Sequence, residues 1–393
     1  MPIKTKTFQT LGFVPSAPKG MVIYMRKIVS MAIFIGLFLS TKVYALDLSA
    51  ECAYLMTADS GVCLYEKNGE VRHNIASTTK IMTAITAIEN GCLDDMVRVS
   101  ANAAAQEGSS VYLRTGNKVL LKDLLYGMLL NSGNDAACAV AEYAGGSVEG
   151  FAKMMNRKAK EIGANNTCFI NPSGLDADGH YSTARDMALI SAYALKNDIF
   201  SEIVSTKTAQ INVGEDICYL KNHNKLLWNY DGCIGVKTGY TKKTGRCLVS
   251  AAERGGITLI AVTLGAPDDW NDHKKMLDYG FENTELILPV KKGDVLKSYS
   301  QRSIVLNAVV KDDIQISAKK NSGMKFDVVV HAVGKASEEI MTGEKIGYAE
   351  CFLGEDKLCE VDLIADIVTN QEEKKIGLIE GFIQRIKKIL LKI

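Results

Sequence analysis

A buried helix is predicted where isoleucines recur at helical spacing. Ile81, Ile85 and Ile88 stand at positions i, i+4 and i+7, which places them on one face of a helix. Asn90 and Gly91 follow them, a combination typical of a helix C-terminus. The pattern therefore predicts a core helix that ends at this pair.

The same reading extends over the region up to residue 284. Helical spacing recurs at 120–131, 136–144, 148–162, 184–195 and 272–279. Strand patterns bounded by turn residues occur at 52–57, 62–65, 234–239, 247–253 and 257–264. Two strands, a block of helices, further strands and a last helix indicate an α+β domain at 46–284. We expect one antiparallel sheet whose first and last strands pair, with helices packed on it.

A second pattern begins at about residue 285, where short strands alternate with turns. The predicted strands are 303–310, 314–317, 326–332, 344–352 and 357–364. This pattern indicates a separate, small all-β domain at 285–370, for which we expect a spacing or stabilising role.

The N-terminal residues 1–45 have the order of an export signal. They carry six Lys or Arg and no Asp or Glu, and the run 28–39 is apolar. A run of that length is too short for the ~20 residues that span a bilayer. Small residues precede position 46, so we expect a leader with a signal peptide that is cleaved after Ala45.

The C-terminal residues 371–393 combine an apolar stripe at three- and four-residue steps with lysines and arginines that lie largely off it. This pattern is typical of an amphipathic helix on a membrane surface. The alternative is a helix that docks on the protein itself. With the export signal, the first interpretation predicts peripheral attachment to the outer face of the bacterial cytoplasmic membrane.

Composition excludes several functions. Without residues 1–45 the chain has 40 basic and 45 acidic residues, a net charge of −5, so a basic nucleic-acid footprint is not expected. The ten cysteines form no C-x-x-C pair, and Cys351 and Cys359 suit either a bridge across a hairpin or free thiols. The five histidines lack H-x-x-x-H spacing and no G-x-S-x-G occurs, which argues against a metallopeptidase or a Ser-His-Asp hydrolase. We expect no metal and no cofactor.

A candidate for chemistry stands at the start of the isoleucine helix. Ser77 and Lys80 are three residues apart, so both lie on one face, and an apolar setting would keep the lysine neutral enough to take a proton from the serine. Alone, such a pair is more often a serine cap beside a surface lysine. The segment 317–320 has the same S-x-x-K pattern, so the pattern needs support from the rest of the chain.

Two further motifs supply that support. Ser132-Gly133-Asn134 and Lys237-Thr238-Gly239 follow in order, which completes the S-x-x-K, S-x-N and K-T-G set of penicillin-binding proteins and class A β-lactamases. A second K-T-G stands at 243–245. We assign the site to Lys237, because it ends an apolar strand that can border a cleft, and we place Lys243 in a solvated turn.

The match extends beyond the triplets, and the chain resembles the serine-type D-alanyl-D-alanine carboxypeptidases, which are low-molecular-mass penicillin-binding proteins. The segments that carry the resemblance are 76–84, 124–127, 132–137, 171–175 and 235–241. The resemblance implies a β-lactamase/transpeptidase-like catalytic domain and removal of the terminal D-alanine from peptidoglycan stem pentapeptides. It also implies inhibition by β-lactams.

By this resemblance, Ser77 attacks the carbonyl between the two D-alanines and Lys80 accepts its proton. Ser132 relays protons to the leaving amine, while Asn134 holds the substrate amide and orients Lys80.

The same resemblance implies substrate binding by the third motif and the residue after it, that is by Lys237, Thr238, Gly239 and Tyr240. Lys237 and Thr238 bind the terminal carboxylate, and Lys237 also keeps Lys80 neutral by like-charge repulsion. The backbone N–H groups of Ser77 and Tyr240 form the oxyanion hole, a feature worth ~3 kcal/mol per donor.

Two other functions remain open on this fold. A serine β-lactamase would need a glutamate on a loop between the second and third motifs, and Glu161 continues a helical run instead. A non-catalytic sensor of muropeptides or β-lactams would not need all three motifs, which are intact here.

Overall fold

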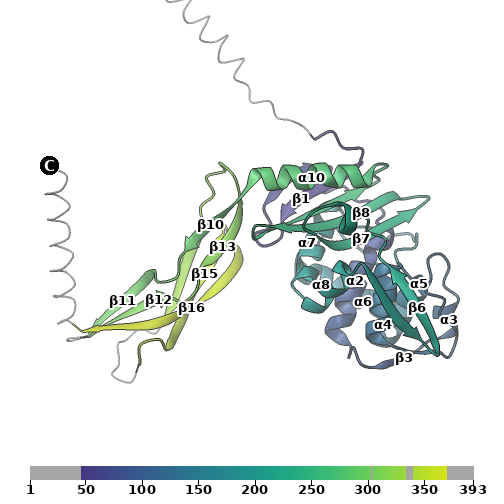
Figure 1. The fold of residues 1–393 in the computed structure, drawn as a ribbon, viewed down its shortest axis with the longest axis horizontal. Helices are drawn as coiled ribbons and strands as arrows, with labels where there is room; N and C mark the ends of the chain where they lie inside the picture. Colours follow the sequence, from purple (N-terminus) through teal and green to yellow (C-terminus); the bar gives the residue numbers. More distant parts are fainter. Residues whose placement is uncertain (1–45, 302–303, 333–339, 370–393) are drawn as a thin grey trace, which may run out of the picture. The chain divides into compact units, whose positions relative to one another are not determined.

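The computed structural model describes residues 46–301, 304–332 and 340–369 (Figure 1). Its catalytic half contains a five-stranded antiparallel sheet, as the sequence predicts. The strand order is β2 (Cys63–Lys67), β1 (Cys52–Thr57), β9 (Ile257–Leu264), β8 (Gly245–Arg254) and β7 (Cys233–Thr241). The early strand β1 pairs along its length with the late strand β9, so segments about 200 residues apart in sequence close one sheet. Strand β7, which carries the third motif, is an edge strand.

Helices cover both faces of this sheet (Figure 1). The longer ones are α2 (Lys80–Asn90), α4 (Leu121–Leu130), α5 (Asn134–Gly145), α6 (Val148–Ile162), α7 (Ala184–Leu195), α8 (Asp198–Ser205) and α10 (Asp269–Asn283). Helix α10 packs on β8 and β9 from one side, and α7 packs on β1 and β9 from the other. The predicted isoleucine helix is α2, whose residues 80–87 are all buried. The burial of every side of these two turns makes α2 a core helix, although Lys80, Thr83 and Thr86 are polar.

Several short elements had no clear sequence signal. They are the turn of 3₁₀-helix η1 (Ala76–Thr79), helices α3 (Ala101–Ala104) and α9 (Leu226–Asn229), and strands β3 (Met96–Arg98), β4 (Lys118–Leu120), β5 (Thr208–Val213) and β6 (Asp216–Lys221). Strands β5 and β6 form a two-stranded hairpin of their own. Most of its side chains are exposed, so hydrophobic patterning gives little indication of it.

The C-terminal residues form a small all-β domain, as predicted. It consists of the pair β10 (Thr284–Val290) and β13 (Ile314–Lys319), and of a five-stranded sheet. The order of that sheet is β11 (Val295–Gln301), β12 (Ile304–Val310), β16 (Asp356–Thr369), β15 (Lys345–Leu353) and β14 (Asp327–Ala332). Its core is separate from that of the catalytic half. Ser317 of the second S-x-x-K pattern lies buried in β13, where no helix follows it.

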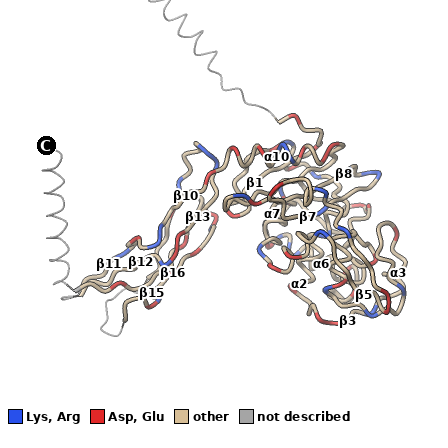
Figure 2. The backbone as a smooth tube through the Cα atoms, in the orientation of Figure 1, with Lys and Arg blue, Asp and Glu red and all other residues tan. Residues whose placement is uncertain are grey.

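Charge and cysteines give no sign of another function in this part of the chain. Basic and acidic residues are interspersed along the backbone (Figure 2). Cys351 and Cys359 face each other across β15 and β16 as free thiols. The expected C-terminal amphipathic helix and the export signal lie outside the described residues. Within the described ranges, no helix has the length and hydrophobicity to cross a bilayer.

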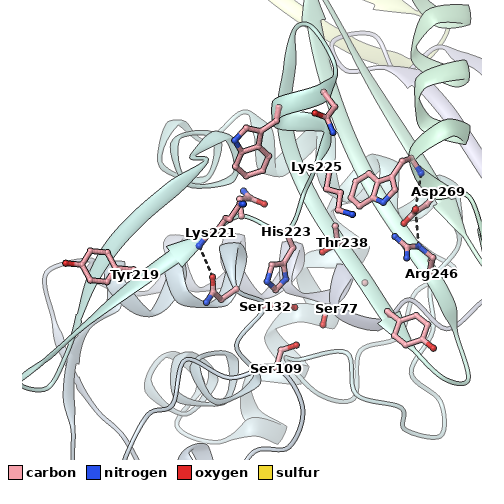
Figure 3. A pocket seen from close by; sticks show the side chains of 17 residues that line it. Ser77, Ser109, Ser132, Tyr219, Lys221, His223, Lys225, Thr238, Arg246 and Asp269 are labelled. Atoms are coloured by element: carbon pink, nitrogen blue, oxygen red, sulfur yellow. Dashed lines mark hydrogen bonds and ion pairs between the residues drawn. The ribbon is translucent and has the colours of Figure 1, made fainter.

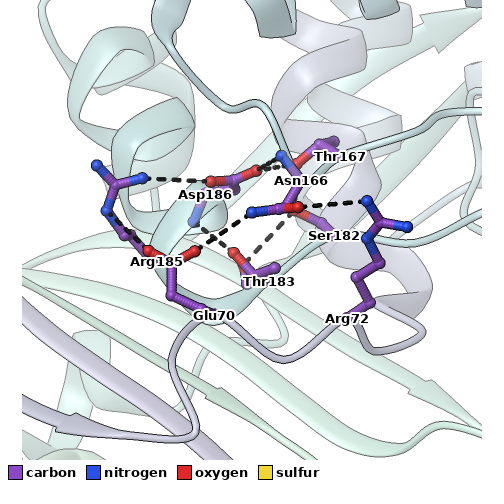
Figure 4. Close-up of polar contacts among 8 residues, drawn as sticks. All are labelled: Glu70, Arg72, Asn166, Thr167, Ser182, Thr183, Arg185 and Asp186. Carbon is purple, nitrogen blue, oxygen red and sulfur yellow. Dashed lines mark hydrogen bonds and ion pairs between the residues drawn. The ribbon is translucent and has the colours of Figure 1, made fainter.

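A polar cluster fixes the segment between α6 and α7 (Figure 4). Asp186, in the first turn of α7, is fully buried and accepts hydrogen bonds from the backbone N–H of Asn166 at 2.7 Å and from Thr167 Oγ1 at 2.8 Å. Thr183 caps the helix by accepting from the N–H of Asp186. Arg185 pairs with Glu70 on the surface side. The cluster holds both ends of the loop 166–183, which reaches the candidate site.

Candidate active site

Ser77 and Lys80 lie side by side where η1 passes into α2. The sequence predicts Ser77 in the first turn of one continuous helix, whereas the structure places it in a 3₁₀ turn and begins α2 at Lys80. Side chains three residues apart eclipse each other in a 3₁₀ turn. As a result the Nζ of Lys80 is 2.8 Å from the Oγ of Ser77.

Lys80 has two further oxygen neighbours. Its Nζ is 2.7 Å from Oδ1 of Asn134 and 2.6 Å from the backbone carbonyl oxygen of Ser173. Carbonyl oxygens only accept hydrogen bonds, so a neutral amine spends both of its N–H donors on them. Its lone pair then remains for the hydroxyl proton of Ser77. This is the arrangement of a base beside a nucleophile.

The surroundings favour the neutral form of Lys80. Its side chain is completely buried, and this burial, followed by the charge of Lys237, lowers its pKa well below the usual value. Asp135 acts weakly in the opposite direction. The three contacts would also fit an ammonium with three donors, but full burial makes a charge at this position costly.

The carbonyl of Ser173 comes from a tight turn at 171–175. Oδ1 of Asn171 accepts the backbone N–H of Gly174 at 2.8 Å, and the carbonyl of Pro172 accepts from Thr83 of α2 at 2.7 Å. Gly174 has φ +83°, and a Cβ there would stand 1.8 Å from the carbonyl oxygen of Ala76. Only glycine allows the turn to approach η1 this closely.

The second motif lies at the junction of α4 and α5. Ser132 has φ +63° and is buried, and Asn134 opens α5. Nδ2 of Asn134 donates to the carbonyl of Glu107 at 2.6 Å, which directs its Oδ1 to Lys80. The next residue, Asp135, accepts from the backbone of Val111 and fixes the neighbouring loop. Sequence reasoning assigned no role to Asp135.

The third motif lies on the edge strand β7. Lys237 is only 2% exposed, and its Nζ has one hydrogen-bond acceptor within the described residues, the carbonyl of Thr238 at 3.0 Å. Burial lowers the pKa of Lys237 to about 7. A Cβ on Gly239 would stand 3.1 Å from the backbone nitrogen of Ser77, so this glycine lets β7 approach η1. Lys243 is exposed in a turn, as predicted.

These residues surround a cleft of about 920 Å³ (Figure 3). Of the predicted site residues, Ser77, Ser132, Thr238, Gly239 and Tyr240 line it, and Lys80, Asn134 and Lys237 are buried behind its wall. The structure thus brings all eight together. His223 also lines the cleft. Residues that sequence reasoning missed complete the wall: Ser109, Lys221, Lys225, Trp228, Arg246, Asp269 and Trp270. They come from separate elements, so no single motif could identify them.

We expect Gly174→Ala to destabilise the protein by ~3 kcal/mol, because the new methyl group would collide with the backbone of Ala76. Gly163→Ala is the matched control. Gly163 has nearly the same φ, +86°, but open space around its Cβ position, so only backbone strain of ~1 kcal/mol is expected. Urea unfolding of both variants measures the difference. Equal losses would contradict the close approach.

Comparison with protein families identifies two regions. Residues 40–268 match the family described as D-alanyl-D-alanine carboxypeptidase, and residues 281–370 match the C-terminal domain of penicillin-binding protein 5. The D-alanyl-D-alanine carboxypeptidase DacF of Bacillus subtilis is 36% identical over 346 residues, which cover 84% of this chain and 87% of the relative. DacC of Escherichia coli is 37% identical over 288 residues, 68% of this chain and 71% of the relative.

Solved structures agree with these matches. The D-alanyl-D-alanine carboxypeptidase DacD from Francisella tularensis has a TM-score of 0.60 at 28% identity and covers 84% of this chain and 96% of its own. The DD-transpeptidase of Streptomyces K15 has a TM-score of 0.58 at 37% identity and covers 61% of this chain and 100% of its own.

Proposed function

This chain belongs to the D-alanyl-D-alanine carboxypeptidase family, and we propose that its reaction passes through an acyl-enzyme on Ser77. It is a serine-type carboxypeptidase of cell-wall synthesis. One observation carries the proposed mechanism. The buried amine of Lys80 contacts the hydroxyl of Ser77, while two carbonyl oxygens occupy its N–H donors.

In the proposed acylation, Ser77 Oγ attacks the carbonyl between the last two D-alanines of the stem pentapeptide, and its proton passes to Lys80. The carbonyl oxygen becomes an oxyanion held by the backbone N–H groups of Ser77 and Tyr240. The approach of Gly239 to the nitrogen of Ser77 supports this placement.

Collapse of the intermediate breaks the C–N bond. Ser132, which lines the cleft, relays a proton to the departing amine, and D-alanine leaves. Water then attacks the acyl-enzyme, with Lys80 again as base, and restores the hydroxyl of Ser77. Over the whole cycle, the hydroxyl of the water molecule ends in the carboxyl group of the shortened peptide and its other hydrogen ends in the amine of D-alanine. The cycle therefore needs no cofactor.

The terminal carboxylate is proposed to bind Lys237 and Thr238. Lys237 is buried with a single neutral acceptor beside it, so an incoming carboxylate would supply the counter-charge that the fold omits.

The β-lactamase alternative finds no support in the site. Glu161 lies on α6, where its carboxylate pairs with Arg157 and Lys158 on the surface. A backbone carbonyl, that of Ser173, contacts Lys80 from the loop between the second and third motifs. Without a carboxylate there to activate water, a β-lactam adduct should persist, so we propose that β-lactams inhibit this enzyme.

The location of the enzyme is also a proposal. We propose that residues 1–45 direct export, that 46–284 form the catalytic domain and 285–370 the β domain, and that 371–393 bind the outer surface of the cytoplasmic membrane. The support is the sequence pattern of both ends: a basic leader with an apolar run, and a basic amphipathic tail.

Incubation with labelled penicillin should give a stable adduct on Ser77, and a stem pentapeptide should release D-alanine. Ser77→Ala should abolish both, because the attacking oxygen is lost. Adduct mass and a D-alanine assay measure the two results. Rapid penicillin turnover would favour a β-lactamase instead. An adduct without D-alanine release would favour a sensor.

The acylation rate should rise with pH as Lys80 loses its proton. Where Lys237 is charged, it lowers the pKa of Lys80, so Lys237→Met should raise that pKa. The rising limb of the pH–rate profile should then move up by about one pH unit, as expected when one neighbouring charge is removed. An uncharged penicillin ester as the acylating agent keeps carboxylate binding out of the measurement.

The control for this pH shift is Lys243→Met, which removes an exposed lysine in a turn and should leave the profile unchanged. A limb that stays in place or moves down in Lys237→Met would refute the repulsion between the two buried lysines.

Deletion of residues 374–393 should release the enzyme from vesicles of anionic phospholipid, because it removes the apolar stripe and its basic flanks. Vesicle sedimentation measures binding, and penicillin acylation of the truncated enzyme checks that its catalytic domain is intact. Unchanged sedimentation of an active truncated enzyme would defeat the membrane proposal.

A further inference from the structure

One wall of the cleft carries cations without anionic partners. Lys221 and Lys225 are exposed, line the cleft and form no ion pair within the described ranges. Arg246 on the same wall is different, because its Nε is 3.0 Å from Oδ1 of Asp269 and its charge is compensated. The wall thus has surplus positive charge, and a substrate anion is the natural counterpart.

The segment that carries these lysines is held rigidly. The Nδ2 of Asn222 donates to the carbonyls of Val204 and Thr206, and its Oδ1 accepts from the backbone of Asn224. The N–H of His223 donates to the carbonyl of Leu130, two residues before Ser132. A backbone fixed in this way places the Cα atoms of both lysines at the cleft, so that their side chains can reach into it.

The two lysines differ in direction. Nζ of Lys225 is 6.0 Å from the ring centre of Trp270, and its side chain points towards Thr238 (Figure 3). Lys221 instead lies 5.7 Å from the ring of Trp228, on the far side of His223 (Figure 3). Lys225 is therefore the cation that faces the third motif.

The place of the scissile carbonyl along β7 indicates which part of the substrate lies beside Lys225. The scissile carbonyl is assigned to the N–H groups of Ser77 and Tyr240, so the leaving residue extends back along β7 towards Thr238. His223 and Lys225 line the same cleft as Thr238, which places the segment 221–225 beside that end of the cleft. Lys225 thus lies on the leaving-group side.

We propose that Lys225 is a specificity-determining residue that binds the terminal carboxylate of the leaving amino acid together with Thr238 and Lys237. This inference rests on the proposed carboxypeptidase reaction. The buried Lys237 has a pKa of about 7, so at neutral pH part of the binding energy of the carboxylate is used to protonate it. An exposed second lysine is charged before the substrate arrives, and it selects peptides with a free C-terminus.

The test compares the full-length enzyme with Lys225→Met, which keeps the length of the side chain but removes its charge. The substrates are a D-alanyl-D-alanine peptide and the same peptide with a C-terminal amide. For the free acid, kcat/KM should fall about tenfold, equal to ~1.4 kcal/mol, whereas for the amide it should change less than about twofold. Lys225→Arg should retain the preference for the acid, and Lys243→Met serves as the matched control with an exposed lysine elsewhere.

Acylation by benzylpenicillin and by its methyl ester gives a second measurement that does not depend on cleavage of the amide. The preference for the free acid should again fall about tenfold in Lys225→Met and weaken with added salt in the unmodified enzyme. Equal losses on acid and ester would indicate a structural role and overturn the inference, as would no loss on either. In both cases continued D-alanine release by the unmodified enzyme would leave the proposed function intact. Absence of that release would overturn the function and this inference together.

Discussion

The site depends on a buried lysine amine whose charged form the fold disfavours. Lys80 is fully buried among three oxygen atoms, two of which can only accept hydrogen bonds. Each of these oxygens comes from a different part of the chain: η1, the start of α5 and the turn at 171–175. The fold must therefore bring distant segments to within 3 Å of one nitrogen. Three features contribute to this arrangement: Gly174, the hydrogen bond from Asn134 to the carbonyl of Glu107, and the polar cluster around Asp186.

The sequence predicts the parts of the fold that rest on long, regular patterns. Helices α6 and α7 begin and end where periodicity places them, and the pairing of β1 with β9 follows from the order of elements. The hairpin β5–β6 was missed because its side chains are mostly exposed and give little hydrophobic signal. The predicted last helix, 272–279, is too short at both ends of α10, Asp269–Asn283. Asp269 is buried in the first turn and pairs with Arg246, and hydrophobic spacing does not predict a buried carboxylate.

The candidate site also has a part that the sequence predicts and a part that only the folded chain reveals. The seven motif residues were predicted because their chemistry requires particular residue types at particular spacings, and Tyr240 followed from the family resemblance. The carbonyl of Ser173 carries no side-chain signal, so only the folded chain reveals it as a partner of Lys80. The wall of Lys225, Arg246 and Trp270 was equally hidden, because it assembles from α9, β8 and α10. Sites formed by distant segments escape local pattern analysis even when the fold class is known.

The two buried lysines also connect substrate recognition with chemistry. In the free enzyme the charge of Lys237 helps to keep Lys80 neutral and therefore ready to accept a proton. A carboxylate bound as proposed would compensate that charge, so the proton affinity of Lys80 would rise at the moment when Ser77 must lose its proton. The base is thus unprotonated before binding and stronger after it. This order of events stabilises the transition state more than the free enzyme. It requires that the carboxylate bind beside Lys237 rather than elsewhere in the cleft.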